Sequence, residues 1–121
     1  MTYVSRRDQT WARLFRVEAV VQQKAKCAYC YCPITMRTAT ADHVKARKLG
    51  GTTKRENILA ACTECNVLKG HKTATAFKTL IKNPEPGCDI RIWLAWSRRR
   101  IFLAADRSCA RIMKAAALTP S

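Results

Sequence analysis

The stretch LAACTECNVLKGHKT, residues 59–73, contains two cysteines separated by two residues, Cys62 and Cys65. A second pair with the same spacing, Cys27 and Cys30, lies upstream in CAYC. Two such pairs suit one tetrahedral Zn²⁺ ion, because a tight turn within each pair can present both sulfurs to the same ion. Zinc binding can contribute on the order of 10 kcal/mol to folding. The sequence therefore predicts a structural zinc site with four thiolate ligands.

The segment between the two pairs is poor in regular structure. It contains Pro33 and Gly50-Gly51 and is rich in threonine. Short apolar stretches at 44–46 and 57–59 indicate two short strands among loops, too small to bury a core of their own. The seven cysteines form an odd number, which favours reduced thiols and metal binding over a disulfide framework. Cys32 leaves one alternative open, since it could replace Cys30 as a ligand.

Helical patterns lie on both sides of this centre. Ser5 and Asp8 have the spacing of a capping box, and a helix is expected over residues 5–25. A second helical pattern begins near Asn66 and can continue to Ile81, before the break KNPEPG at 82–87. Asp89 is placed to cap a long final helix. One face of the first helix is expected to carry Trp11, Leu14, Val17 and Val21, and one side of the last Ile90, Leu94, Ile101, Ala105 and Ile112.

The length of 121 residues predicts a single domain over 1–121, with an N-terminal helical part (1–26), a zinc-containing core (27–82) and a C-terminal helix (88–118). Lys and Arg number 23 against 8 Asp and Glu, a net charge of +15 spread along the whole chain. Such a charge attracts polyanions and favours a nucleic-acid partner. No apolar run reaches the roughly 18 residues of a membrane span. No signal-peptide pattern is seen. A cytoplasmic protein, not secreted and without a membrane partner, is expected.

Chemistry-bearing residues stand between the cysteine pairs, in TADHVKARKLGGTTKRENILAAC. Asp42 and His43 are an adjacent acid and imidazole, which can take different roles if the backbone directs them to opposite sides. The chain has only two histidines, and His43 lies beside an acid in a basic protein with a predicted zinc site. We therefore interpret Asp42 and His43 as functional residues.

The order Cys-x-x-Cys, Asp-His, Gly-Gly, Asn before an apolar pair, Cys-x-x-Cys-Asn and Lys-Gly closely resembles the HNH (ββα-metal) endonucleases of the zinc-stapled kind, which include bacterial restriction-type and phage members. The matching elements extend over residues 27–73. The resemblance implies an α+β fold with a small ββα-metal core and a four-cysteine zinc site, flanked by N- and C-terminal helices. It also implies metal-dependent hydrolysis of DNA phosphodiester bonds.

The resemblance assigns a role to each matching position. His43 matches the general base, a role that suits an imidazole near neutral pH. Asp42 matches a ligand of the catalytic divalent cation, and Asn66 matches a second ligand through its carbonyl oxygen. Such oxygen donors suit Mg²⁺ or Mn²⁺. Asn57 matches the asparagine that fixes the loop carrying the base. Lys69 and Lys72, in the following helix, are expected to contact DNA phosphates or to be ordinary exposed lysines.

Some features depart from the family pattern or leave a choice. Tyr31 stands where many relatives have glycine, and the proline often found after Asp-His is missing. His71 is five residues beyond Asn66, a poor spacing for a third ligand on one helix face. The main alternative is a non-catalytic zinc module that binds nucleic acid. A zinc deaminase is disfavoured, because its His-x-Glu signature is absent. One HNH site cuts one strand, and the sequence does not distinguish a monomer from a dimer.

Overall fold

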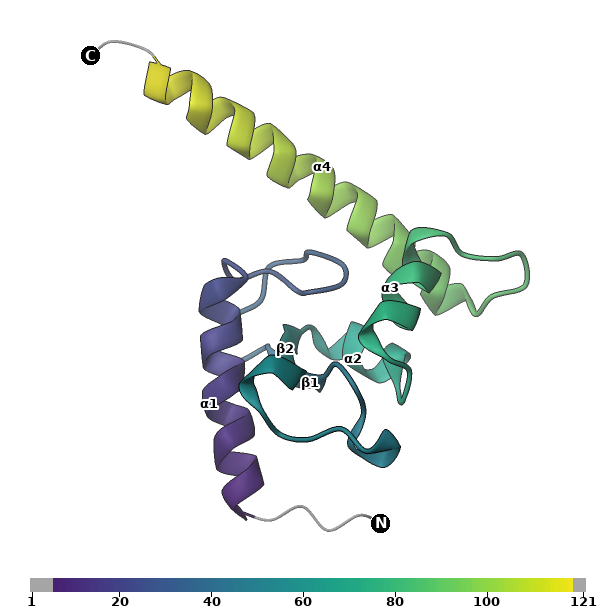
Figure 1. Ribbon diagram of the computed structural model, residues 1–121. Helices are drawn as coiled ribbons and strands as arrows, with labels where there is room; N and C mark the ends of the chain where they lie inside the picture. The colour runs from purple at the N-terminus through teal and green to yellow at the C-terminus, as the bar shows by residue number, and fades with distance from the viewer. Residues whose placement is uncertain (1–5, 119–121) are drawn as a thin grey trace.

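A computed structural model describes residues 6–118, and the chain forms a small α+β structure with a two-stranded sheet at its centre (Figure 1). Ser5, the predicted capping residue of the first helix, lies outside the described residues. The elements in chain order are α1 (Arg6–Gln22), β1 (Thr40–His43), the 3₁₀ turns η1 (Arg47–Leu49) and η2 (Arg55–Asn57), β2 (Ile58–Ala61), α2 (Thr63–Lys69), α3 (Ala74–Lys82) and α4 (Ile90–Leu118).

The strands β1 and β2 are antiparallel, with Asp42 opposite Leu59 and His43 opposite Ile58. The first strand was predicted at 44–46 but lies at 40–43, so that prediction is too late in the chain. The amide group of Asn57 accounts for the difference. It accepts a hydrogen bond from the Lys45 backbone N–H and donates one to the Lys45 carbonyl, so a side chain replaces the ladder where a longer strand would continue.

Helix α1 packs against the sheet. Its buried residues are Phe15, Ala19 and Val20, and the predicted face is wrong, because Trp11, Leu14, Val17 and Val21 are all exposed. A sheet of two strands offers only a narrow surface, and the small Ala19 allows the helix to approach it closely. The larger apolar residues are thereby left on the outer flank, although Trp11 still stacks on Phe15 with ring centroids 5.5 Å apart.

The single helix predicted from Asn66 to Ile81 is divided into α2 and α3. Gly70 ends α2 with φ 56° and ψ −126°, a backbone conformation outside the helical region. Thr73 then begins α3, because its side-chain oxygen accepts a hydrogen bond from the backbone N–H of Ala76. Helix α2 also begins three residues earlier than predicted, at Thr63.

Helix α4 begins as the sequence predicts, since the Asp89 carboxylate accepts a hydrogen bond of 2.9 Å from the Arg91 backbone N–H. Its first turns pack on α3 through the buried Ile92 and Ala95. The middle of the helix stays in contact with the first cysteine loop through the ion pair between Asp106 and Lys26, and its last turns extend away from the molecule (Figure 1). The residues predicted to form its apolar side are all exposed: Ile90, Leu94, Ile101, Ala105 and Ile112. No described helix is both long and apolar enough to cross a membrane.

Candidate active site and metal centre

The four predicted zinc ligands converge on one point. The sulfur atoms of Cys27, Cys30, Cys62 and Cys65 all lie within 4.8 Å of one another, and all four residues are buried. The Cys30 and Cys62 sulfurs are 3.7 Å apart. A tetrahedral zinc with Zn–S bonds of about 2.3 Å has S–S edges of about 3.8 Å, so the cluster has the dimensions of a zinc site. Cys32 is not part of this cluster, and Cys30 is.

Backbone amides and one arginine surround the sulfurs. The Cys62 N–H points at the Cys27 sulfur at 3.3 Å, and the Cys65 N–H points at the Cys62 sulfur at 3.4 Å. The Arg98 guanidinium, from α4, lies 3.7 Å from the Cys65 sulfur. Positive and partly positive groups of this kind stabilise thiolates. Tyr31, which departs from the glycine of the predicted family pattern, has φ 62°, the left-handed conformation that glycine adopts most easily.

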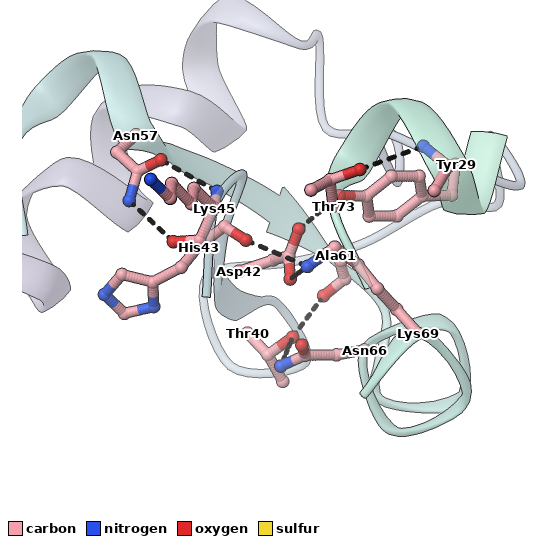
Figure 2. Close-up of polar contacts among 11 residues, drawn as sticks. Tyr29, Thr40, Asp42, His43, Lys45, Asn57, Ala61, Asn66, Lys69 and Thr73 are labelled. Atoms are coloured by element: carbon pink, nitrogen blue, oxygen red, sulfur yellow. Dashed lines mark hydrogen bonds and ion pairs between the residues drawn. The ribbon is translucent and has the colours of Figure 1, made fainter. Parts of the chain in front are cut away.

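His43 lies at the end of β1, one residue after Asp42. Consecutive strand residues point to opposite faces of a sheet, so the side chains of Asp42 and His43 leave the backbone in opposite directions (Figure 2). The His43 ring is half-buried, and its Nε2 lies 3.3 Å from the Thr53 hydroxyl. Burial, and then the charge of Arg47, lowers the pKa of His43 below its ordinary value. The imidazole is therefore neutral near pH 7, as a general base requires.

Asn57 holds the loop that follows His43. Besides its two bonds to Lys45, its Nδ2 donates to the Thr52 carbonyl at 2.7 Å. Gly51 closes the same loop, because a Cβ there would lie 1.7 Å from the Lys45 carbonyl oxygen. The Gly-Gly pair and Asn57 thus shape one turn, and Asn57 is directed at backbone rather than into the cavity that His43 lines.

Asn66 follows Cys65 directly on α2, so the cysteine cluster fixes its position. Its Nδ2 donates to the Thr40 hydroxyl at 3.0 Å. No hydrogen bond from residues 6–118 reaches its Oδ1, which leaves a carbonyl oxygen available to a ligand. A turn that carries a zinc ligand therefore also presents the predicted oxygen ligand.

The surroundings of Asp42 differ from those expected of an open metal ligand. One carboxylate oxygen lies 3.0 Å from the Lys69 ammonium, and the other accepts a hydrogen bond from the Tyr29 hydroxyl (Figure 2). The side chains of Lys69 and Asp42 are only 1% and 3% exposed. Lys69 also donates to the His43 carbonyl at 2.9 Å. The Lys69 ammonium faces the interior of the protein, so this structure does not show the predicted contact with a DNA phosphate.

Tyr29 was not singled out in the sequence, although it stands inside the first cysteine pair. It is 1% exposed and meets Phe77 edge to face, with centroids 5.0 Å apart. Burial, followed by the neighbouring Asp42, raises the pKa of Tyr29, so its hydroxyl stays protonated and donates. Its position between two cysteines was the only signal that could have found it.

Asp42, His43 and Asn66 line a single open cavity of about 530 Å³. Arg47, Lys48, Lys69 and His71 also line it, so its walls are basic. Lys72 is exposed and lies outside it. A carboxylate and a free amide oxygen are hard donors that fit Mg²⁺ or Mn²⁺. The donor set therefore fits such an ion, provided that the Asp42 carboxylate is released from its partners.

Residues 27–81 match the family model described as HNH endonuclease. The consecutive elements β1, β2 and α2, together with the cysteine cluster, agree with the fold expected of that family. This match confirms the predicted resemblance of residues 27–81 to HNH endonucleases, and the predicted fold class is confirmed.

The chain is also similar to parts of two Cas9 proteins. It is 41% identical over 73 residues to a CRISPR-associated endonuclease Cas9 from Corynebacterium diphtheriae, a match that covers 60% of the chain and 6% of the relative. It also resembles the crystal structure of the Type II-C Cas9 enzyme from Actinomyces naeslundii, with a TM-score of 0.51 and 25% identity over 80% of the chain and 9% of that protein. The chain spans less than a tenth of the length of either relative.

Proposed function

We propose that the chain is a nuclease that hydrolyses DNA phosphodiester bonds at the cavity lined by Asp42, His43 and Asn66. The observation that carries the proposal is the presence of these three residues on one basic cavity beside the cysteine cluster. The match of residues 27–81 to the HNH endonuclease model supports a hydrolytic role for such a cavity. The net charge of +15 supports a polyanionic substrate.

Each residue of the cavity has a task that its geometry supports. His43 accepts the proton of the attacking water at a ring nitrogen, and its lowered pKa keeps that nitrogen unprotonated near neutral pH. Asn57 holds the loop that carries this histidine. Asp42 and Asn66 would hold a divalent cation, which when bound supplies charge stabilisation at the phosphate and the leaving oxygen. Arg47 and Lys48 offer positive charge to the flanking phosphates.

The experiment is a plasmid-nicking assay with Mg²⁺, Mn²⁺ or chelator, on the wild-type chain and His43→Ala. We expect nicking by the wild type only with added divalent cation, and loss of at least about a hundredfold in His43→Ala, the lower range for a general base. Thr75→Ala, an exposed position on α3, is the control and should nick normally. Zinc content and DNA binding, measured on all three, separate lost chemistry from lost structure.

A zinc-containing module that binds nucleic acid without cutting it is the second candidate. The engagement of Asp42 by Lys69 and Tyr29 favours it, because a carboxylate satisfied inside the protein does not need a cation. This candidate predicts that clean wild-type protein binds DNA and contains zinc but does not nick with any divalent ion. The same assay therefore decides between the two candidates.

A further inference from the structure

The carboxylate of Asp42 is the only oxygen-anion ligand in the candidate catalytic cluster, and both of its oxygens already have partners. Lys69 lies on one oxygen at 3.0 Å and the Tyr29 hydroxyl on the other. We infer that Lys69 is a built-in counter-ion that competes with the catalytic divalent cation for Asp42, and so sets the metal affinity of the site. This inference rests on the proposed function, since it concerns the same cation.

The position of Lys69 suits a competitor. It is three residues after Asn66 on α2, so the two side chains lie on one helix face and reach the same cavity. Its ammonium has a second anchor in the His43 carbonyl at 2.9 Å, which holds it beside the carboxylate. With the side chain 1% exposed, the charge is neutralised by Asp42 rather than by water.

An ammonium and a metal ion exclude each other at this carboxylate. A protonated amine has three donors and no lone pair, so Lys69 cannot itself become a ligand while it is charged. A divalent ion bound to Asp42 would stand within about 4 Å of the ammonium, where like charges repel strongly in a protein interior. Metal binding therefore requires Lys69 to leave Asp42. The long side chain can do so, because the cavity beside it is open to solvent.

A purely structural role for Lys69 makes the opposite prediction. If Lys69 only ties α2 to β1, its removal loosens the position of Asp42 and leaves metal binding unchanged or weaker. A competitor gives tighter binding when it is removed. The sign of the change in metal affinity therefore separates the two roles without any cleavage assay.

The experiment titrates Mn²⁺ into the zinc-loaded chain without DNA and follows free Mn²⁺ by electron paramagnetic resonance. We expect Lys69→Met to bind Mn²⁺ at least about tenfold more tightly than wild type. This gain is modest beside the repulsion expected between the bound cation and one buried ammonium. Lys82→Met, an exposed lysine at the end of α3, should bind as wild type. Equal or weaker binding by a folded Lys69→Met overturns the inference.

A second measurement uses only the wild-type chain and does not depend on the folding of a variant. Brief acetylation under native conditions, read by mass spectrometry, should leave Lys69 unmodified without metal and modify it at saturating Mn²⁺. Lys82 should react equally in both. Protection of Lys69 that persists at saturating Mn²⁺ overturns the inference. Because neither measurement involves DNA, a wild type that shifts Lys69 but fails to nick would refute the proposed function alone.

Discussion

Replacing Asp42 by asparagine tests the buried network that joins β1, α2 and the first cysteine pair. The change keeps the size of the side chain and removes its charge, so the Lys69 ammonium is left buried without a counter-ion. Removing one partner of a buried ion pair typically costs about 3–5 kcal/mol. Here the side chains are 1% and 3% exposed, which places the pair in this class rather than among surface pairs.

The surroundings of Lys69 move the expected cost toward the lower end of that range. The His43 carbonyl still accepts from the ammonium at 2.9 Å, and an asparagine oxygen can still accept from the Tyr29 hydroxyl. We therefore expect Asp42→Asn to lower the free energy of unfolding by about 3 kcal/mol. Small domains have about 5–15 kcal/mol in total, so the variant should remain folded at 25 °C.

The assay is urea unfolding at pH 7 with the zinc content checked before and after. Glu18→Gln is the matched control, because it breaks the Arg55 pair, whose side chains are 59% and 35% exposed. An exposed pair contributes at most about 1 kcal/mol, so this variant should unfold almost as wild type does. A loss below about 1 kcal/mol for Asp42→Asn would refute the reasoning, since it would mean that Lys69 finds water or another anion.

Three further outcomes are expected. Chelation of the metal or Cys65→Ser should abolish the cooperative unfolding transition seen by circular dichroism, because zinc contributes on the order of 10 kcal/mol to a small core. The acidic limb of the pH profile of nicking should have its midpoint below pH 6.5, because the pKa of His43 is lowered and a general base must be unprotonated. Arg47→Met removes a charge that lowers this pKa, so the midpoint should move upward. An unchanged or lower midpoint contradicts the assignment of His43 as the base. Asn57→Ala should lower the free energy of unfolding, measured in urea, by about 2–3 kcal/mol, because three hydrogen bonds are lost. Asn83→Ala, at an exposed position, should change it little.

Local features of the sequence predicted the parts of the fold that depend on local chemistry. The cysteine spacing predicted a cluster whose sulfurs are within 4.8 Å of one another. Each tight turn already places two sulfurs side by side, so the fold has only to bring the two turns together. Asp89 predicted the start of α4, since capping involves atoms two residues apart. The position of Asn66 directly after Cys65 likewise placed it beside the cluster.

The orientation of the helices and the contacts of Lys69 could not be predicted in this way. The exposed faces of α1 and α4 carry regularly spaced large apolar residues, and only the contact of α1 with the narrow sheet and the contacts of α4 with α2, α3 and the first cysteine loop decide which side is covered. Lys69 has the appearance of an exposed helical lysine in sequence. Its partners, the Asp42 carboxylate and the His43 carbonyl, are 27 and 26 positions away, so no local pattern indicates them.

The sequence by itself predicted the resemblance to HNH endonucleases, the four-cysteine cluster and the candidate residues Asp42, His43 and Asn66, because these are properties of residue type and spacing. Only the tertiary structure decided that Asp42 is paired inside the protein and that Lys69, not solvent, is its neighbour. The physical reason is that a buried charge must be neutralised by whichever group the fold brings within about 3–4 Å, and that choice is made by packing between distant segments.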